Sequence, residues 1–192
     1  ICKESVETIG KTLRELEIIA VDDGSTDGSG AICGQWAEGD PRFRVLRQEN
    51  RGPGGARNAG MDAAAGDVIF FFDSDDEAES GLVEKTLLRF RETGAQVVLY
   101  GCSHVMGKTA VPRPLTAPKP VFTGGEIQKE LLPSLFTYGF GAGVSPWGKG
   151  YDLGFLRSHD LWFPEEQGLV CEDGLFMLAL FSKVSCAAVL PD

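Results

Sequence analysis

The chain has 192 residues, of which 43% are hydrophobic and 24% charged, which is typical of one soluble globular domain and excludes a disordered chain. Its net charge of -10, with no basic stripe, argues against nucleic acid as a partner. Five scattered cysteines without a CxxC pair predict neither a disulfide framework nor a zinc ribbon, and they favour a reduced, cytoplasmic setting.

The first half of the chain predicts alternating strands and helices. Expected strands cover 17–21, 43–46, 68–72 and 96–100, and expected helices cover 26–38, 54–65 and 80–93. This alternation indicates an α/β fold with a mostly parallel, twisted sheet flanked by helices. The run VIFFF at 68–72 has no polar alternation and is expected to be buried on both faces. Gly66 and Gly94 are expected to end the helices before them in the left-handed conformation.

The second half of the chain departs from this pattern. Residues 107–121 contain four prolines and predict an exposed connection. The sequence TGGE at 123–126 is typical of a capping box that opens a helix through residue 135. A glycine-rich stretch follows at 139–154, and 172–183 is the last expected helix. We interpret 1–192 as a single domain with two functional halves, 1–105 and 106–192.

The strongest chemical signal is the acidic sequence DSDDE at 73–77, which follows the expected buried strand. With Glu79, five carboxylates fall within seven residues. Charges this close repel unless a cation lies among them, and a divalent ion bound by one or two carboxylates and by substrate phosphates would remove the repulsion. A solvated acidic turn before a helix is the alternative. The position directly after a buried strand favours the cation site.

Two further motifs are expected at the same crevice. VDDGSTD at 21–27 also closes a strand, so a carboxylate there can accept hydrogen bonds from a base or a ribose; the alternative is a helix cap formed by Ser25 or Thr26. The loop 50–60 is neither a dinucleotide fingerprint, since Arg57 stands where glycine is required, nor a P-loop. Its glycines lead into a helix and predict an anion site to which Arg57 adds a donor, unless Arg57 pairs with a nearby carboxylate.

A fourth motif, CEDGLF at 171–176, places two carboxylates at the start of the final helix, which is common and does not by itself indicate a site. In chain order, however, VDDGSTDGS, GPGGARNAG, FFDSDD, SPWGKGY and CEDGLF together resemble family 2 glycosyltransferases. The resemblance runs from about residue 13 to residue 176. It implies a Rossmann-like GT-A fold, with a nucleotide-sugar-binding half over 1–105 and an acceptor-side half over 106–192.

The resemblance also implies an activity and the residues that carry it. The donor would be a nucleotide-diphospho-sugar such as a UDP-sugar, the cofactor Mn²⁺ or Mg²⁺, and the acceptor a glycan or a lipid-linked sugar, with inversion at the anomeric carbon. Asp23 would contact the nucleobase and Arg57 would lie near the nucleotide. Asp73 would bind the ribose or the metal, and Asp75 would bind the metal. Asp173 would be the general base that takes the proton of the acceptor hydroxyl.

The sequence departs from the family pattern in two places. The family's first strand is not found, so we expect the chain to be truncated at both ends, with that strand belonging between the strands that end at Asp23 and Asp73. Gly148 and Gly150 flank Lys149 where the family has larger residues, which predicts a looser acceptor-side loop. No apolar run approaches the ~20 residues of a membrane span, so contact with the inner face of a membrane is not encoded in this chain.

Three rival classes share parts of the pattern. A phosphohydrolase of the haloacid dehalogenase type also places Asp-x-Asp after a strand, but it requires Thr or Val where Glu77 stands. A response-regulator receiver is shorter and leaves the second half of the chain without a role. A non-catalytic nucleotide-sugar-binding module would keep the fold without turnover, and only an activity measurement separates it from an enzyme.

Overall fold

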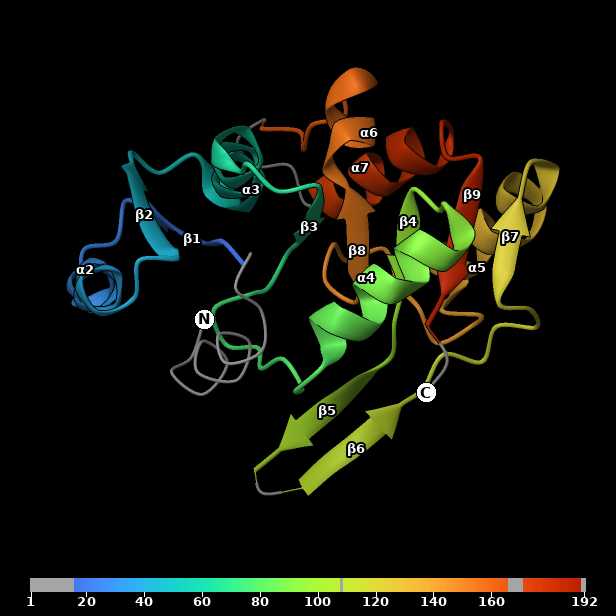
Figure 1. Cartoon of the computed structure of the whole chain (residues 1–192), viewed down its shortest axis with the longest axis horizontal. Helices are drawn as coiled ribbons and strands as arrows, with labels where there is room; N and C mark the ends of the chain where they lie inside the picture. The colour runs from blue at the N-terminus through green and yellow to red at the C-terminus, as the bar shows by residue number, and fades with distance from the viewer. Residues whose placement is uncertain (1–15, 108, 166–170, 191–192) are drawn as a thin grey trace.

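The computed structural model describes residues 16–107, 109–165 and 171–190, and Figure 1 shows their arrangement. The elements, in chain order, are β1 Ile18–Asp23, α2 Ser29–Gly39, β2 Phe43–Gln48, α3 Gly52–Ala63, β3 Val68–Phe70, α4 Leu82–Thr93, β4 Val97–Leu99, β5 Cys102–Met106, β6 Thr109–Arg113, β7 Val121–Thr123, η1 Ile127–Leu131, α5 Leu132–Thr137, β8 Lys149–Asp152, α6 Leu153–Ser158, α7 Glu172–Phe181 and β9 Cys186–Val189.

The main sheet has the strand order β3-β8-β4-β9-β7. β4 pairs in parallel with β9, whereas β8 pairs antiparallel with both β3 and β4, and β7 pairs antiparallel with β9. Since β3 and β4 both oppose β8, they run in the same direction and their carboxyl ends lie at one edge of the sheet. The α/β class with a helix-flanked sheet is confirmed. This sheet is mixed and not mostly parallel as expected, because β8 and β7 add three antiparallel pairs that the sequence pattern did not predict.

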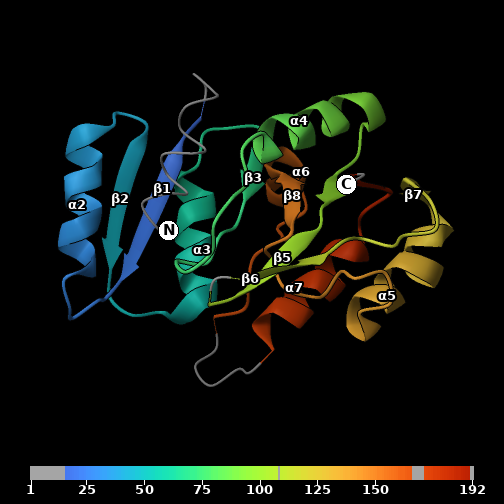
Figure 2. The same cartoon turned by 90° about the horizontal axis from the view of Figure 1, so that it is seen from below.

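Helices cover both faces of this sheet, α4 on one side and α5 with α7 on the other (Figure 2). The side chains of the fully buried strand β4 contribute to the cores on both faces, because alternate side chains of a strand point to opposite faces. Val97 and Leu99 belong to the large core that includes Phe176 of α7. Val98 belongs to a smaller core against which Phe90 of α4 packs.

The strands β1 and β2 form a separate parallel pair, in which Asp23 lies beside Gln48. Ile18 and Phe43 are its buried residues, and Trp36 of α2 packs against them. We expected a further strand to lie between β1 and β3, which would keep these two strands from pairing with each other. They do not pair. Among the residues that the structure describes, no strand occupies that position.

Two expectations about the middle of the chain are wrong. β3 spans only Val68–Phe70 and its side chains are partly exposed, because within the described residues it pairs on one side only, with β8. Of the run 68–72, only Phe71 is buried. Gly66 does not cap α3, which ends at Ala63 and continues into an extended residue, whereas Gly94 ends α4 with φ 63° as predicted.

The connection over 107–121 is largely exposed as expected, but part of it forms a hairpin that was not predicted. β5 and β6 pair antiparallel and project from the domain (Figure 1), with Pro112 opposite Ser103. Proline is tolerated in edge strands, which explains why a strand forms despite Pro112. The hairpin carries exposed apolar side chains, with Val105 71% and Met106 74% exposed.

One of the two hydrogen bonds of the expected capping box is present. The backbone N–H of Thr123 donates to Oε2 of Glu126 at 2.9 Å, which is the reciprocal bond that this motif predicts. The helix opens with the π-turn η1 and continues as α5 to Thr137, two residues beyond the expected end at 135. Glu126 also forms an ion pair with Lys119, whose Nζ lies 2.8 Å from Oε1.

The start of α3 packs so closely against the segment after α6 that it requires glycine. A Cβ at Gly54 would lie 2.4 Å from the backbone oxygen of Pro164. We therefore expect Gly54→Ala to lower the free energy of unfolding by ~1–3 kcal/mol in chemical denaturation. Gly34 in α2 has nothing within 4 Å of its Cβ position, so Gly34→Ala should instead stabilise by ~0.5–1 kcal/mol. Equal effects of the two substitutions would contradict this packing.

Candidate functional site

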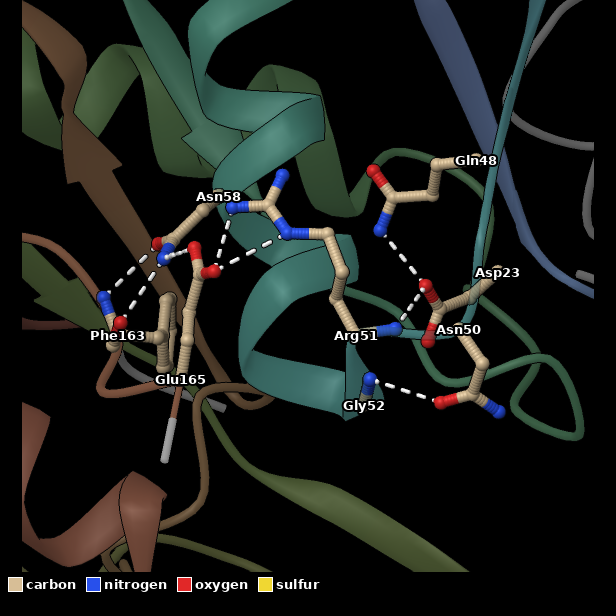
Figure 3. Close-up of polar contacts among 8 residues, drawn as sticks. All are labelled: Asp23, Gln48, Asn50, Arg51, Gly52, Asn58, Phe163 and Glu165. Atoms are coloured by element: carbon tan, nitrogen blue, oxygen red, sulfur yellow. Dashed lines mark hydrogen bonds and ion pairs between the residues drawn. The ribbon is translucent and has the colours of Figure 1, made fainter. Parts of the chain in front are cut away.

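The two carboxylates at the end of β1, Asp22 and Asp23, have different hydrogen-bond partners. Oδ1 of Asp22 accepts the backbone N–H of Ser25 at 2.9 Å, and the hydrogen bonds from Ser25 lower the pKa of Asp22. Oδ1 of Asp23 accepts Nε2 of Gln48 at 2.7 Å and the backbone N–H of Arg51 at 2.9 Å (Figure 3). Asp23 is therefore fixed against the glycine loop, residues 50–60, through its bond to Arg51. Helix α2 begins at Ser29, so the expected cap by Ser25 or Thr26 is wrong.

The glycine loop and the start of α3 are held by a network across more than 100 residues of sequence (Figure 3). Nε of Arg51 donates to Oε2 of Glu165 at 3.1 Å, and Nδ2 of Asn58 donates to Oε1 of the same carboxylate at 2.7 Å. Asn58 also exchanges two hydrogen bonds of 2.9 Å with the backbone of Phe163. Bonds from Asn58 and Arg51 lower the pKa of Glu165. The network fixes where the N-terminus of α3 points.

Arg57 joins carboxylates from two distant parts of the chain. Its Nη1 lies 2.6 Å from Oδ1 of Asp173 and 3.9 Å from Oε1 of Glu172 at the start of α7. Its Nη2 lies 3.4 Å from Oδ1 of Asp73, just after β3. The guanidinium also lies over the ring of Phe163, 5.3 Å from the centroid. The sequence leaves open whether Arg57 pairs with a carboxylate, and the structure shows that it does. The pairing brings together three predicted site residues, Arg57, Asp73 and Asp173.

The acidic loop after β3 is as crowded as its sequence predicts. Asp73 is 46% exposed and Asp75 is exposed. Burial, followed by the charges of Asp73 and Asp75, raises the pKa of Asp76. Within 16–107, 109–165 and 171–190, no set of three or more His, Cys, Asp or Glu side chains is arranged to hold a metal ion. One or two carboxylates with substrate phosphates are the usual Mg²⁺ ligands, so the hard oxygens of Asp73 and Asp75 fit such an ion.

Asp173 lies in the first turn of α7, with 26% of its side chain exposed. Burial raises its pKa, and the charge of Arg57 opposes that effect, while Glu172 and Asp73 add to it. The carboxylate is thus partly desolvated and still reachable from solvent. A general base needs both properties, since desolvation makes a carboxylate more basic and access admits a substrate.

Lys149 at the start of β8 was not predicted as part of the site. It is 2% exposed, and its Nζ donates to the backbone oxygens of Gly143 and Ser145, each at 2.8 Å. Two residues along β8, the hydroxyl of the buried Tyr151 donates to the oxygen of Pro146 at 2.7 Å. These bonds fix the loop between α5 and β8, which was expected to be loose. The charge of Asp173 acts on both side chains.

Burial lowers the pKa of Lys149 to about 7, against a smaller opposite effect of Asp173. Between that value and the ordinary lysine pKa the unfolded chain binds the proton that the folded chain has lost. Stability relative to Lys149→Met should therefore rise with pH above about 7, by ~1.4 kcal/mol per pH unit. Denaturant titrations of both proteins between pH 6 and 8.5 measure this difference. A difference independent of pH would contradict the lowered pKa.

A surface hollow of about 600 Å³ lies at the opposite end of β3 and contains none of the predicted site residues. Two of its charged lining groups have structural roles. Arg157 donates to the carbonyl oxygens of Met61 and Ala64 at the end of α3, and Oδ1 of Asp152 accepts the backbone N–H of Phe155 at the start of α6. The carboxylates, and not this hollow, define the candidate site.

The chain matches the model of glycosyl transferase family 2 over residues 2–145, and it belongs to this family. That membership agrees with the carboxylates found at the ends of β1 and β3, and it removes the phosphohydrolase and receiver alternatives. Within the described parts of the chain, no helix is long and apolar enough to cross a membrane.

Named relatives and solved structures agree with the family. Glycosyltransferase GlyG of Streptococcus pneumoniae is 45% identical over 98 residues, covering 50% of this chain and 33% of the relative. The cholesterol galactosyltransferase of Borreliella burgdorferi is 29% identical over 185 residues, covering 93% of this chain and 51% of the relative. The S. aureus TarS 1-349 complex with UDP superposes with a TM-score of 0.78 at 26% identity, covering 98% of this chain and 53% of the TarS chain. The chain thus spans between one third and about half of these proteins.

Proposed function

We propose that this chain is the nucleotide-sugar-binding part of an inverting glycosyltransferase, which moves a sugar from a UDP-sugar to a hydroxyl of a glycan or lipid-linked acceptor. The observation that carries the proposal is the Arg57 bridge, because it joins a carboxylate on the expected donor side, Asp73, to one on the expected acceptor side, Asp173. The TarS structures in complex with UDP and with UDP-GlcNAc support a uridine donor.

Asp23 is proposed to receive the nucleobase. Its Oδ1 accepts both bonds that tie it to Gln48 and Arg51, while its Oδ2 accepts none from the described residues. A carboxylate oxygen so oriented can accept an N–H of the base. The fixed geometry of the glycine loop favours binding, because less conformational freedom is lost when the nucleotide arrives.

Asp73 and Asp75 are proposed to hold Mn²⁺ or Mg²⁺ with the donor diphosphate. Repulsion within the acidic loop supports this role, since burial and the neighbouring carboxylates together raise the pKa of Asp76. When bound, such an ion stabilises the negative charge that gathers on the departing diphosphate. The protein's own part is to place two hard oxygen ligands at the carboxyl end of β3.

Asp173 is proposed to be the general base. A sugar hydroxyl is a poor nucleophile until a group within hydrogen-bond reach takes its proton. The oxygen of the hydroxyl then bonds to the anomeric carbon on the face opposite the diphosphate, and the bond between that carbon and the diphosphate breaks. Direct displacement of this kind inverts the anomeric centre.

A thermal-shift screen of nucleotide sugars with Mn²⁺ or Mg²⁺ tests donor binding. A ligand at 100 times its Kd adds ~2.7 kcal/mol of stability, so a specific donor should stand out from the others. Measuring release of the nucleotide from the selected donor then separates an enzyme from a non-catalytic binding module. No stabilisation by any nucleotide sugar would contradict the proposed function.

A further inference from the structure

We propose that Arg57 is a positioning residue for the carboxylate of Asp173 and not a ligand of the nucleotide. This inference rests on the proposed function, in which Asp173 is the base. It changes the role that the family resemblance implies for Arg57, and it predicts which kinetic constant depends on this side chain.

The first argument is the geometry of the guanidinium. Nη1 is occupied by Oδ1 of Asp173 at 2.6 Å, and Nη2 points to Oδ1 of Asp73 at 3.4 Å. Its side chain is only 14% exposed. A planar guanidinium presents its five N–H donors in fixed directions, so the two hydrogen bonds to Asp173 and Asp73 fix the orientation in which the remaining donors point.

The second argument is that the position of Arg57 is itself fixed. The guanidinium lies over the ring of Phe163, and that ring stacks on Phe176 of α7 with centroids 3.8 Å apart and planes 17° apart. Asp173 belongs to the first turn of the same helix. The base, the arginine and the two rings therefore form one packed unit, in which movement of Arg57 towards a ligand would disturb Asp173.

The third argument concerns the two oxygens of Asp173. Oδ1 is bound by Arg57, and Oδ2 receives no hydrogen bond from any described residue. Arg57 thereby orients the carboxylate and leaves one oxygen for the substrate. In the transfer step the proton of the acceptor hydroxyl moves to Oδ2 and the hydroxyl oxygen bonds to the anomeric carbon. The C–O bond between that carbon and the diphosphate breaks, and its electron pair leaves on the nucleotide.

Charge supports the same assignment. Three carboxylates, those of Asp73, Glu172 and Asp173, lie within 4 Å of the Arg57 guanidinium. If Arg57 turned to a phosphate, it would leave these like charges facing one another in a partly buried site. Its charge also opposes the effect of burial on the pKa of Asp173 and so favours the ionised form of the base.

The test compares Arg57→Met and Arg57→Lys with Asp173→Asn. Two constants are measured for each: the Kd of UDP with Mn²⁺ by calorimetry, and the rate of UDP release from the UDP-sugar that the screen selects. We expect Arg57→Met to lower turnover by ~100-fold, as misplacement of a reacting group does, with the Kd of UDP changed less than ~3-fold. Arg57→Lys should recover part of the rate, because it keeps the charge but not the fork.

A double variant gives the sharpest outcome. If Arg57 acts only through Asp173, Arg57→Met combined with Asp173→Asn should be no slower than Asp173→Asn alone, since effects of groups acting as a unit are not additive. Arg44→Met is the matched control, because Arg44 also forms an ion pair, with Glu17 at 2.6 Å, and lies near the start of β2, away from Gln48 at its end. Its turnover should stay at the wild-type rate.

Two results would overturn the proposal. One is a loss of UDP affinity of ~10-fold or more in Arg57→Met and Arg57→Lys with a nearly unchanged maximal rate, which is the signature of a nucleotide ligand. The other is additive losses in the double variant. Failure of the proposed function looks different, because Asp173→Asn alone would then release UDP at the wild-type rate. Thermal unfolding of each variant identifies any loss of rate that comes from unfolding.

Discussion

Asp173→Asn should lower the rate of sugar transfer by ~10²–10⁴-fold, the usual contribution of a general base, while the affinity for the donor stays near the wild-type value. The reason is that Asp173 acts on the acceptor hydroxyl, and its partly exposed carboxylate is held at the start of α7 by Arg57. The amide keeps the shape of the side chain but cannot accept the proton. Transfer rates with the selected donor, together with calorimetry of donor binding, measure the two effects separately.

Glu172→Gln is the matched control for this substitution. Glu172 precedes Asp173 in the same helical turn, but it lies 3.9 Å from Nη1 of Arg57, where Asp173 lies at 2.6 Å. We expect a loss of less than ~10-fold, because an ion pair at this longer distance contributes less. If Asp173→Asn and Glu172→Gln both weakened donor binding equally, the pair would serve only the start of the helix.

Asp75→Asn should remove the dependence of nucleotide binding on a divalent ion. Asp75 is exposed on the acidic loop after β3, where burial and the charges of Asp73 and Asp75 raise the pKa of Asp76. We expect the affinity for UDP in Mn²⁺ to fall by ~100-fold, or ~2.7 kcal/mol, to the level that the wild type shows in chelator. Calorimetric titration with Mn²⁺ and with excess EDTA gives all four values.

Asp67→Asn controls for the loss of one negative charge. Asp67 is also exposed, but it lies just before β3, at the opposite end of the strand from the acidic loop. Its substitution should leave both the affinity for UDP and the requirement for metal unchanged. UDP binding by the wild type that is equally strong in EDTA would remove Asp75 from the metal site.

The parts of the fold that could be predicted are those in which local pattern and tertiary environment agree. The βα alternation through β4 follows from apolar runs separated by amphipathic helices, and Gly94 and the capping box at Thr123 mark helix ends by local chemistry. β8 and β9 could not be predicted, because KGYD and CAAV are four-residue segments with little apolar periodicity. Their burial comes from the strands on either side, which lie far away in sequence.

The site shows the same division. The carboxylates Asp23 and Asp73 could be chosen because each ends or follows an expected strand, a position set by local sequence. Asp173 opens a helix, where acidic residues are common, and it could be chosen only through the family resemblance. The roles of Glu165 and Lys149 depend on long-range contacts: Glu165 receives Arg51 and Asn58 across more than 100 residues. The sequence around Lys149, with a glycine on each side, predicts an exposed side chain. In the fold this side chain is buried and donates to a carbonyl oxygen of the preceding loop.

The most direct test of a metal-dependent glycosyltransferase is the release of UDP by the wild-type protein. The protein is incubated with the UDP-sugar that the thermal-shift screen selects and with a mixture of glycan acceptors, in Mn²⁺ and in excess EDTA. We predict release that requires Mn²⁺, increases with acceptor and is lost in Asp173→Asn. Metal-dependent binding of the UDP-sugar without any release of UDP would contradict the account, because the chain would then be a binding module that performs no transfer.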